Sequence, residues 1–142
     1  MIPTRPSLTP REQRLTEGVI THLPLFAGVP PQGIQVVARR CSILDACRGD
    51  VIALSGPLGV GKTALARAIL GSLGHKGEVP SPTFAIVQPY DELELPVWHV
   101  DLYRIEEAGE IDELGRDSAS DAVLLVEWPE RAGASAWPEA LR

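Results

Sequence analysis

Apolar and polar residues follow patterns along the chain that predict strands alternating with helices. Two short stretches, Val51–Ser55 (VIALS) and 122–127 (AVLLVE), are almost wholly apolar, which is typical of strands buried on both faces. Residues 97–104 (VWHVDLYR) instead alternate, which predicts a strand whose two faces differ, with His99 and Asp101 sharing one of them.

A further strand is expected at 82–90 (PTFAIVQPY), which Pro89 should end. Only the short turn 91–96 separates it from the strand at 97–104. Two strands joined so closely are expected to pair antiparallel, because a parallel pair needs a longer crossover. With helices between the other strands, the chain predicts an α/β fold with a mostly parallel central sheet flanked by helices.

Helical spacing marks the intervening stretches. Apolar residues recur three and four positions apart from Ile34 to Leu44, which predicts a helix that the residues 48–50 (RGD) end. Good helix formers follow Gly61, and Gly74 is the expected terminator. The acidic stretch 105–117 predicts another short helix.

The 142 residues are enough for one compact domain and too few for two. Residues 1–30 are rich in proline and threonine, with only a short helix and a turn predicted in them, so we expect an N-terminal extension whose order the sequence does not determine. Residues 31–142 are expected to form the main domain. Cys41 and Cys47 lie in a predicted helix without metal-ligand spacing or a partner pair, which favours reduced, buried thiols.

Charge and hydropathy exclude several classes of protein. The formal net charge of −6 argues against a broad nucleic-acid-binding surface, which would be basic. No apolar run approaches the length of a membrane span, and the first residues lack the apolar core of a secretory signal. We therefore expect a cytoplasmic protein that does not bind membranes.

One glycine-rich segment, GPLGVGKT, matches the phosphate-binding pattern G-x-x-x-x-G-K-[ST] in full. Such a match arises by chance in about one chain of this length in two hundred, and here a predicted strand precedes it and a predicted helix follows. The glycines let backbone N–H groups face phosphate oxygens, Lys62 bridges the β- and γ-phosphates, and the Thr63 hydroxyl binds Mg²⁺. The competing interpretation is a turn with a solvated lysine. The segment predicts a nucleotide site formed by Gly56, Leu58, Gly59, Val60, Gly61, Lys62, Thr63 and Ala64.

Two acidic residues end predicted buried strands. Glu127 follows AVLLV, which is the pattern of a second Mg²⁺ ligand, and Asp101 ends VWHVD in a similar way. Ligands of open α/β sheets bind at the carboxyl ends of the strands. One carboxylate is expected to hold the metal and the other to orient the attacking water, and the residues alone leave open which does which.

Several neighbouring side chains have two interpretations each. His99 is a candidate general base, although a lone histidine in a strand is more often a satisfied core residue. Thr83, in SPT, is either a switch element that contacts the γ-phosphate or a turn cap. Tyr103 and Arg104 either contact a substrate or partner or simply pack, and Trp128 is expected to make an apolar contact beside the site.

The motifs GPLGVGKT, SPTF, HVDLYR and VEWPE, in this order and spacing, closely resemble the TsaE family of bacterial P-loop ATPases. The resemblance runs from about Ile34 to Arg131, and the four motifs together are highly specific. It implies a P-loop NTPase fold and an ATP-binding, ATP-hydrolysing component of the complex that makes N6-threonylcarbamoyladenosine next to the tRNA anticodon. Members act with a tRNA threonylcarbamoyl transferase and its inactive paralogue, the TsaD and TsaB families, and reach tRNA only through that complex.

Residue by residue, the resemblance implies ATP and Mg²⁺ as cofactors. Lys62 would be the phosphate-loop lysine, and Thr63 and Glu127 would be the magnesium ligands. Asp101 would be the acid needed for hydrolysis, and Thr83 the switch-like threonine. Trp128 would lie beside the active site.

The chain departs from the family pattern at both ends. Members normally continue for a few dozen residues after the EWP segment with closing strands, so the resemblance implies either a truncated product or a domain lacking its C-terminal strands. Members also have a short strand and a threonine-bearing loop before the first helix. Here residues 23–40 are weakly similar to the helical lead-in of a cyclic-nucleotide-binding domain instead.

Two other functions compete with the ATPase. A small P-loop kinase also uses a phosphate loop, but such kinases carry an arginine-rich lid that this sequence does not show. A nucleotide-binding interaction module without turnover is the second alternative. A GTPase is disfavoured because the guanine-reading motif N-K-x-D is missing from the sequence.

Overall fold

The computed structural model describes residues 8–41, 45–107, 109–111, 120–133, 136–137 and 140. Its contacts divide the chain into two compact units, with the boundary between Asp45 and Ala46. The predicted domain boundary between residues 30 and 31 stays a prediction. None of the helices among the described residues has the length and apolar character that a membrane crossing requires.

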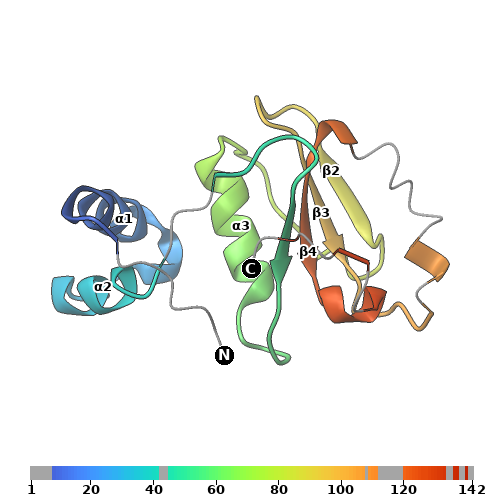
Figure 1. The fold of residues 1–142 in the computed structure, drawn as a ribbon, viewed down its shortest axis with the longest axis horizontal. Coiled ribbons are helices and arrows are strands. Elements are labelled where there is room, and N and C mark those ends of the chain that lie inside the picture. Colours follow the sequence, from blue (N-terminus) through green and yellow to red (C-terminus); the bar gives the residue numbers. More distant parts are fainter. Residues whose placement is uncertain are drawn as a thin grey trace. The chain divides into compact units, whose positions relative to one another are not determined.

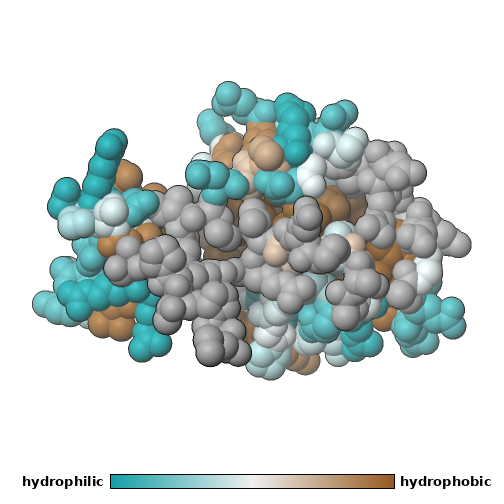
Figure 2. Space-filling view, viewed as in Figure 1, coloured by the Kyte–Doolittle hydropathy of each residue, from teal (hydrophilic) through white to brown (hydrophobic). Residues whose placement is uncertain are grey.

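The first unit contains α1 (Pro10–His22), the short 3-10 helix η1 (Pro24–Phe26) and α2 (Pro31–Ala38), shown in Figure 1. Its core consists of Ile20, Ile34 and Ala38, with Phe26, Val37 and Cys41 packed against them. On the surface of these helices hydrophobic residues lie beside hydrophilic ones (Figure 2), and the exposed apolar side chains include Leu15, Val19 and Val36.

The helix α1 begins with the mostly polar residues PREQR. Thr9 and Glu12 form a capping box, in which the Glu12 N–H donates to the Thr9 hydroxyl and the Thr9 N–H donates to the Glu12 carboxylate over 2.8 Å. Pro10 occupies the first helical turn, where its missing N–H costs no hydrogen bond. These start signals therefore extend the helix over polar residues that periodicity does not include.

The second unit is built on a four-stranded sheet in the order β1-β4-β3-β2. Its strands are β1 (Val51–Leu54), β2 (Val87–Tyr90), β3 (Val97–Asp101) and β4 (Val123–Glu127). The pairs β1–β4 and β4–β3 are parallel, whereas β3–β2 is antiparallel. The predicted α/β fold with a mostly parallel sheet is confirmed, as is the antiparallel pair.

Apolar side chains cover both faces of the sheet. On one face the helix α3 (Lys62–Ser72) buries Ala66 and Leu70 against Leu54, Leu125 and Val97. The residues buried on the other face include Val100, Val126, Leu102, Ile105 and Ala132. Ala132 belongs to the 3-10 helix η4 (Pro129–Ala132). Leu125 and Val126 belong to opposite clusters, so β4 is buried on both faces as predicted. In β1, at the edge of the sheet, Val51 and Ile52 are only half-buried.

The helix predicted from Ile34 onward is shorter than expected. It ends at Ala38, so neither cysteine is helical. The prediction of buried thiols is wrong for Cys47, which is exposed, and Cys41 is half-buried. The carboxylate of Asp50 accepts hydrogen bonds from the Cys47 N–H (2.8 Å) and thiol (3.4 Å), and this contact raises the pKa of the thiol.

The strand predicted at 82–90 forms only in its second half. Residues 82–86 turn, and Ile86 has a left-handed φ of 65°, which is unusual for a β-branched residue. Pro89 lies inside β2, paired in register with Trp98, and does not end it. An edge strand tolerates proline where the nitrogen faces away from the partner strand.

The acidic segment before β4 lies only partly within the described residues. Of the acidic helix expected at 105–117, residues 109–111 form a 3-10 turn, while Ala108 and residues 112–119 lie outside the described residues. At the far end of α3, Gly74 follows the C-cap with a left-handed φ of 106°, as its predicted role as terminator requires.

Candidate nucleotide-binding site

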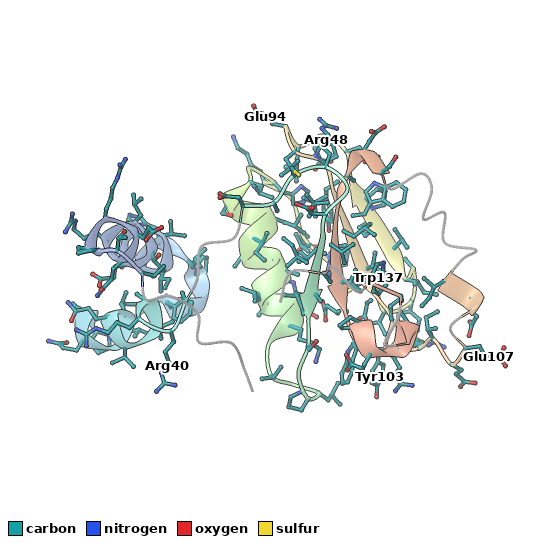
Figure 3. All side chains as sticks on the ribbon, in the orientation of Figure 1. Arg40, Arg48, Glu94, Tyr103, Glu107 and Trp137 are labelled. Atoms are coloured by element: carbon teal, nitrogen blue, oxygen red, sulfur yellow. The ribbon has the colours of Figure 1, made fainter. Side chains whose placement is uncertain are left out.

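The register of the sheet brings three strand ends into line. Leu54 of β1 pairs with Glu127 of β4, and Glu127 pairs with Asp101 of β3. The glycine-rich loop leaves β1 at this edge, next to both acids. Tyr103 lies two residues after Asp101, and Figure 3 shows Tyr103 and Arg48 at opposite ends of the second unit. The site therefore lies at the carboxyl ends of the parallel strands, where ligands of such sheets bind.

The loop between β1 and α3 uses glycine where a side chain would be strained. Gly61 is the N-cap of α3 with a left-handed φ of 101°, and nothing lies within 4 Å of a Cβ built there. A Cβ on Gly56 would lie 2.9 Å from Cγ1 of Val60. The loop thus leaves open space in front of the positive end of α3, which suits an anion.

Lys62 is buried, with 8% of its surface exposed. Its Nζ donates to the carbonyls of Gly56 (2.8 Å) and Pro57 (2.9 Å) and lies 3.8 Å from the ring centroid of Trp128. Trp128 adopts a left-handed φ of 57°, and its ring packs beside Tyr103, with 5.1 Å between ring centroids. No carboxylate among the described residues forms a salt bridge with Lys62, so its charge remains available to an anionic ligand.

Glu127 connects three elements of the site. Its Oε2 accepts a hydrogen bond of 3.0 Å from the Thr63 hydroxyl at the start of α3. Its Oε1 lies 2.8 Å from Nε2 of His99 on β3. Both His99 and Glu127 are almost completely buried. The predicted pair Thr63 and Glu127 is therefore in direct contact.

Asp101 is held on both oxygens. Its Oδ1 accepts from the backbone N–H of Tyr103 at 2.9 Å. Its Oδ2 accepts from the hydroxyl of Thr83 at 3.0 Å and, more weakly, from that of Ser81 at 3.5 Å. The loop after α3 is thereby tied to the end of β3, because the side chains of Ser81 and Thr83 converge on one carboxylate.

These groups surround one pocket of about 390 Å³. Its lining consists of Leu58, Gly59, Gly61, Lys62, Thr63, Ala64, Ser81, Thr83, Asp101, Tyr103, Glu127 and Trp128. Two residues predicted from the phosphate-loop motif do not line it: Gly56 contributes a carbonyl to Lys62, and Val60 is exposed. That the lining residues bind a nucleotide stays a prediction.

The donor set fits Mg²⁺ carried by a nucleotide. A hydroxyl and a carboxylate in contact, Thr63 and Glu127, are the hard oxygen ligands that Mg²⁺ prefers. Within the described residues no group of three or more histidine, cysteine or acidic side chains is placed to hold a metal. An ion that takes most of its ligands from phosphates and water needs only one or two from the protein.

One feature of the site was not expected from the sequence. The stacking of Lys62 on Trp128 depends on the left-handed backbone of Trp128, which no local signal in EWP predicts. His99 is a buried residue, as the core interpretation predicts, and its Nε2 contacts Glu127, while its Nδ1 has no hydrogen-bond partner among the described residues. Tyr103 lines the pocket, whereas the guanidinium of Arg104 lies 5.0 Å from the ring of Phe84, which is exposed.

Comparison with known proteins identifies relatives of this chain. A family model described as "Threonylcarbamoyl adenosine biosynthesis protein TsaE" matches residues 32–142. The tRNA threonylcarbamoyladenosine biosynthesis protein TsaE of Haemophilus influenzae is 40% identical over 92 residues, which are 63% of this chain and 58% of that protein. The TsaE protein of Bacillus subtilis is 38% identical over 102 residues, 70% of this chain and 63% of that protein.

The chain thus spans less than two thirds of the length of either relative. Among solved structures, the crystal structure of YdiB from Bacillus subtilis matches 95% of this chain and 66% of that chain with a TM-score of 0.48 and 26% identity. The family model covers most of the residues, including the glycine-rich loop and both strand-end acids, and this chain therefore belongs to the TsaE family.

Proposed function

We propose that this chain binds ATP with Mg²⁺ and hydrolyses it as a component of the complex that makes threonylcarbamoyladenosine in tRNA. The observation that carries the proposal is the single pocket in which Lys62 and Thr63 of the glycine-rich loop meet Glu127 and Asp101. Membership of the TsaE family supports the pathway. The transferase and its paralogue, of the TsaD and TsaB families, are the proposed partners, and the cytoplasm is the proposed location.

The loop would hold the triphosphate. Its amides and the start of α3 offer partial positive charge, and Lys62 would exchange the carbonyls of Gly56 and Pro57 for oxygens of the β- and γ-phosphates. The ring of Trp128 covers one side of the ammonium group and excludes water from it. This exchange would favour ATP binding, because a hydrogen bond from the ammonium group to an anionic phosphate is stronger than one to a neutral carbonyl.

Thr63 and Glu127 would hold the Mg²⁺, which when bound neutralises negative charge on the phosphates. Asp101 is the proposed base. Its carboxylate lines the same pocket and is fixed by the Tyr103 N–H and the Thr83 hydroxyl. It would orient a water whose oxygen bonds to the γ-phosphorus while the bond from that phosphorus to the bridging oxygen breaks. ADP leaves, and the proton of the water passes through Asp101 to solvent.

The test is release of inorganic phosphate from Mg·ATP by the purified chain, with and without the transferase and its paralogue. Lys62→Ala should abolish ATP binding, because the pocket loses its buried cation. Lys76→Ala is the matched control, since it removes the only other lysine of the chain from an exposed position. This control variant should behave like the wild type.

Two arms of the same assay address the other functions. Phosphate transferred to added nucleosides or sugars in place of water would identify a kinase. Mg·ATP binding without phosphate release, even in the presence of both partner proteins, would identify an interaction module. Either result would contradict the proposed ATPase.

A further inference from the structure

We infer that His99 is a positioning residue, which holds the carboxylate of Glu127 so that its second oxygen faces Thr63 and the metal. The inference rests on the proposed function, because it concerns the same pocket. His99 does not line that pocket and would touch neither nucleotide nor metal. It acts through Glu127.

A continuous chain of contacts carries the inference. Nε2 of His99 lies 2.8 Å from Oε1 of Glu127, and Oε2 of Glu127 accepts from the Thr63 hydroxyl at 3.0 Å. The two hydrogen bonds use different oxygens, so together they fix the rotation of the carboxylate group. One anchor is in β3 and the other is at the start of α3, while Glu127 itself ends β4.

The ring of His99 is well placed to be the fixed end of this chain. It has no exposed surface, and the parallel register pairs His99 with Leu125, two residues before Glu127 on the same face of β4. The two side chains meet across this pair of strands, with 2.8 Å between Nε2 of His99 and Oε1 of Glu127. At the other end of the chain of contacts, the hydrogen bond from Thr63 to Oε2 of Glu127 would have to lengthen or break for both oxygens to bind a metal.

The hydrogen-bonding chemistry assigns the ring a single polar contact. An ionised carboxylate only accepts, so Nε2 of His99 carries the hydrogen. Nδ1 has no hydrogen-bond partner within the described part of the chain. The ring therefore makes its one polar interaction with Glu127. Second-neighbour contacts of this kind typically change metal affinity 10- to 100-fold when they are removed.

Three substitutions separate hydrogen bonding from packing. In His99→Gln the amide nitrogen is as many bonds from Cβ as Nε2 is, so it can still donate to Glu127. In His99→Asn the amide nitrogen takes the place of Nδ1 and falls short. His99→Leu removes the donor and fills the buried space with an apolar side chain. The glutamine and asparagine variants are both polar and neutral, so their comparison decides the matter even if the leucine variant fails to fold.

The measurement is binding of Mn²⁺, followed by electron paramagnetic resonance of the free ion, to each variant saturated with ADP. His99→Asn and His99→Leu should bind Mn²⁺ about 10-fold more weakly or worse, and His99→Gln should recover most of the affinity. Affinity for a fluorescent ADP analogue in EDTA should be the same in all of them. A merely structural role would instead lower metal and nucleotide binding together.

The two hypotheses fail in different ways. If the wild type binds neither ADP nor Mn²⁺·ADP, the proposed function is wrong, and this inference with it. If the wild type binds Mn²⁺·ADP and the asparagine variant binds the ion equally well, the inference alone is overturned. A folded glutamine variant that loses as much Mn²⁺ affinity as the asparagine variant would also overturn it.

Discussion

Asp101→Asn is the substitution that most directly tests the proposed chemistry. The side chains of aspartate and asparagine have the same shape. Oδ1 of asparagine can still accept from the Tyr103 N–H, and the hydroxyl of Thr83 can rotate to accept from the new amide, where it now donates to Oδ2. The contacts that hold the loop at Ser81 and Thr83 to the end of β3 are thus retained, while the negative charge and the ability to accept a proton are lost.

The size of the effect follows from the role. A positioned general base typically accelerates a reaction 10²- to 10⁴-fold. Since each factor of ten is about 1.4 kcal/mol, the barrier to hydrolysis should rise by about 3–5 kcal/mol. Affinity for ADP should change little, because Asp101 contacts neither Lys62 nor Thr63, the two residues proposed to hold the phosphates and metal.

The assay is phosphate release in a single turnover at saturating Mg·ATP, together with calorimetric binding of ADP. Asp91→Asn is the control: Asp91 accepts from the indole N–H of Trp98 at 3.0 Å but does not line the pocket. That variant should retain the wild-type rate. A folded Asp101→Asn protein that hydrolyses ATP within threefold of the wild type would refute the role of Asp101 as a base.

Three further predictions concern the fold and the surface. Tyr90→Phe should stabilise the protein by about 1 kcal/mol in urea unfolding, because within the described residues the buried hydroxyl of Tyr90 has no hydrogen-bond partner; destabilisation would mean that the hydroxyl is satisfied. Leu125→Ala should lower the free energy of unfolding by about 3 kcal/mol in the same assay, since Leu125 is fully buried in the inner strand β4. A decrease below about 1 kcal/mol would contradict that packing. Asp50→Asn should lower the pKa of Cys47 and so speed its alkylation below that pKa, where more of the thiol becomes thiolate. Alkylation of Cys41 in the same sample serves as the internal reference. An unchanged rate of Cys47 alkylation would contradict the contact with Asp50.

Local sequence signals predict the central part of the site well. The glycine-rich loop lies between one strand and one helix, and its shape depends on residues that are neighbours in sequence. The alignment of Glu127 with Asp101 also follows from the pattern, because both end strands of one parallel sheet. Fold class and the main pocket residues could therefore be predicted without coordinates.

Contacts between distant segments could not be predicted in the same way. Thr83 to Ile86 has the composition of a strand, yet the chain turns there, and Asp101 binds both the Thr83 hydroxyl and, through its own N–H, the Ile86 carbonyl. Those tertiary bonds outweigh a local β preference. The position of Trp128 over Lys62 likewise depends on a left-handed backbone that tryptophan seldom adopts.

The proline inside β2 has a consequence for how copies of this protein meet. Among the described strands β2 is at the margin of the sheet, and a margin with free amide groups is a template for association with another chain. Pro89 interrupts that template, because it offers no N–H to an incoming strand. At the β2 edge this interruption opposes the addition of another strand, and Pro89→Val would be expected to remove that protection while leaving the pocket at the other end of the strands unchanged.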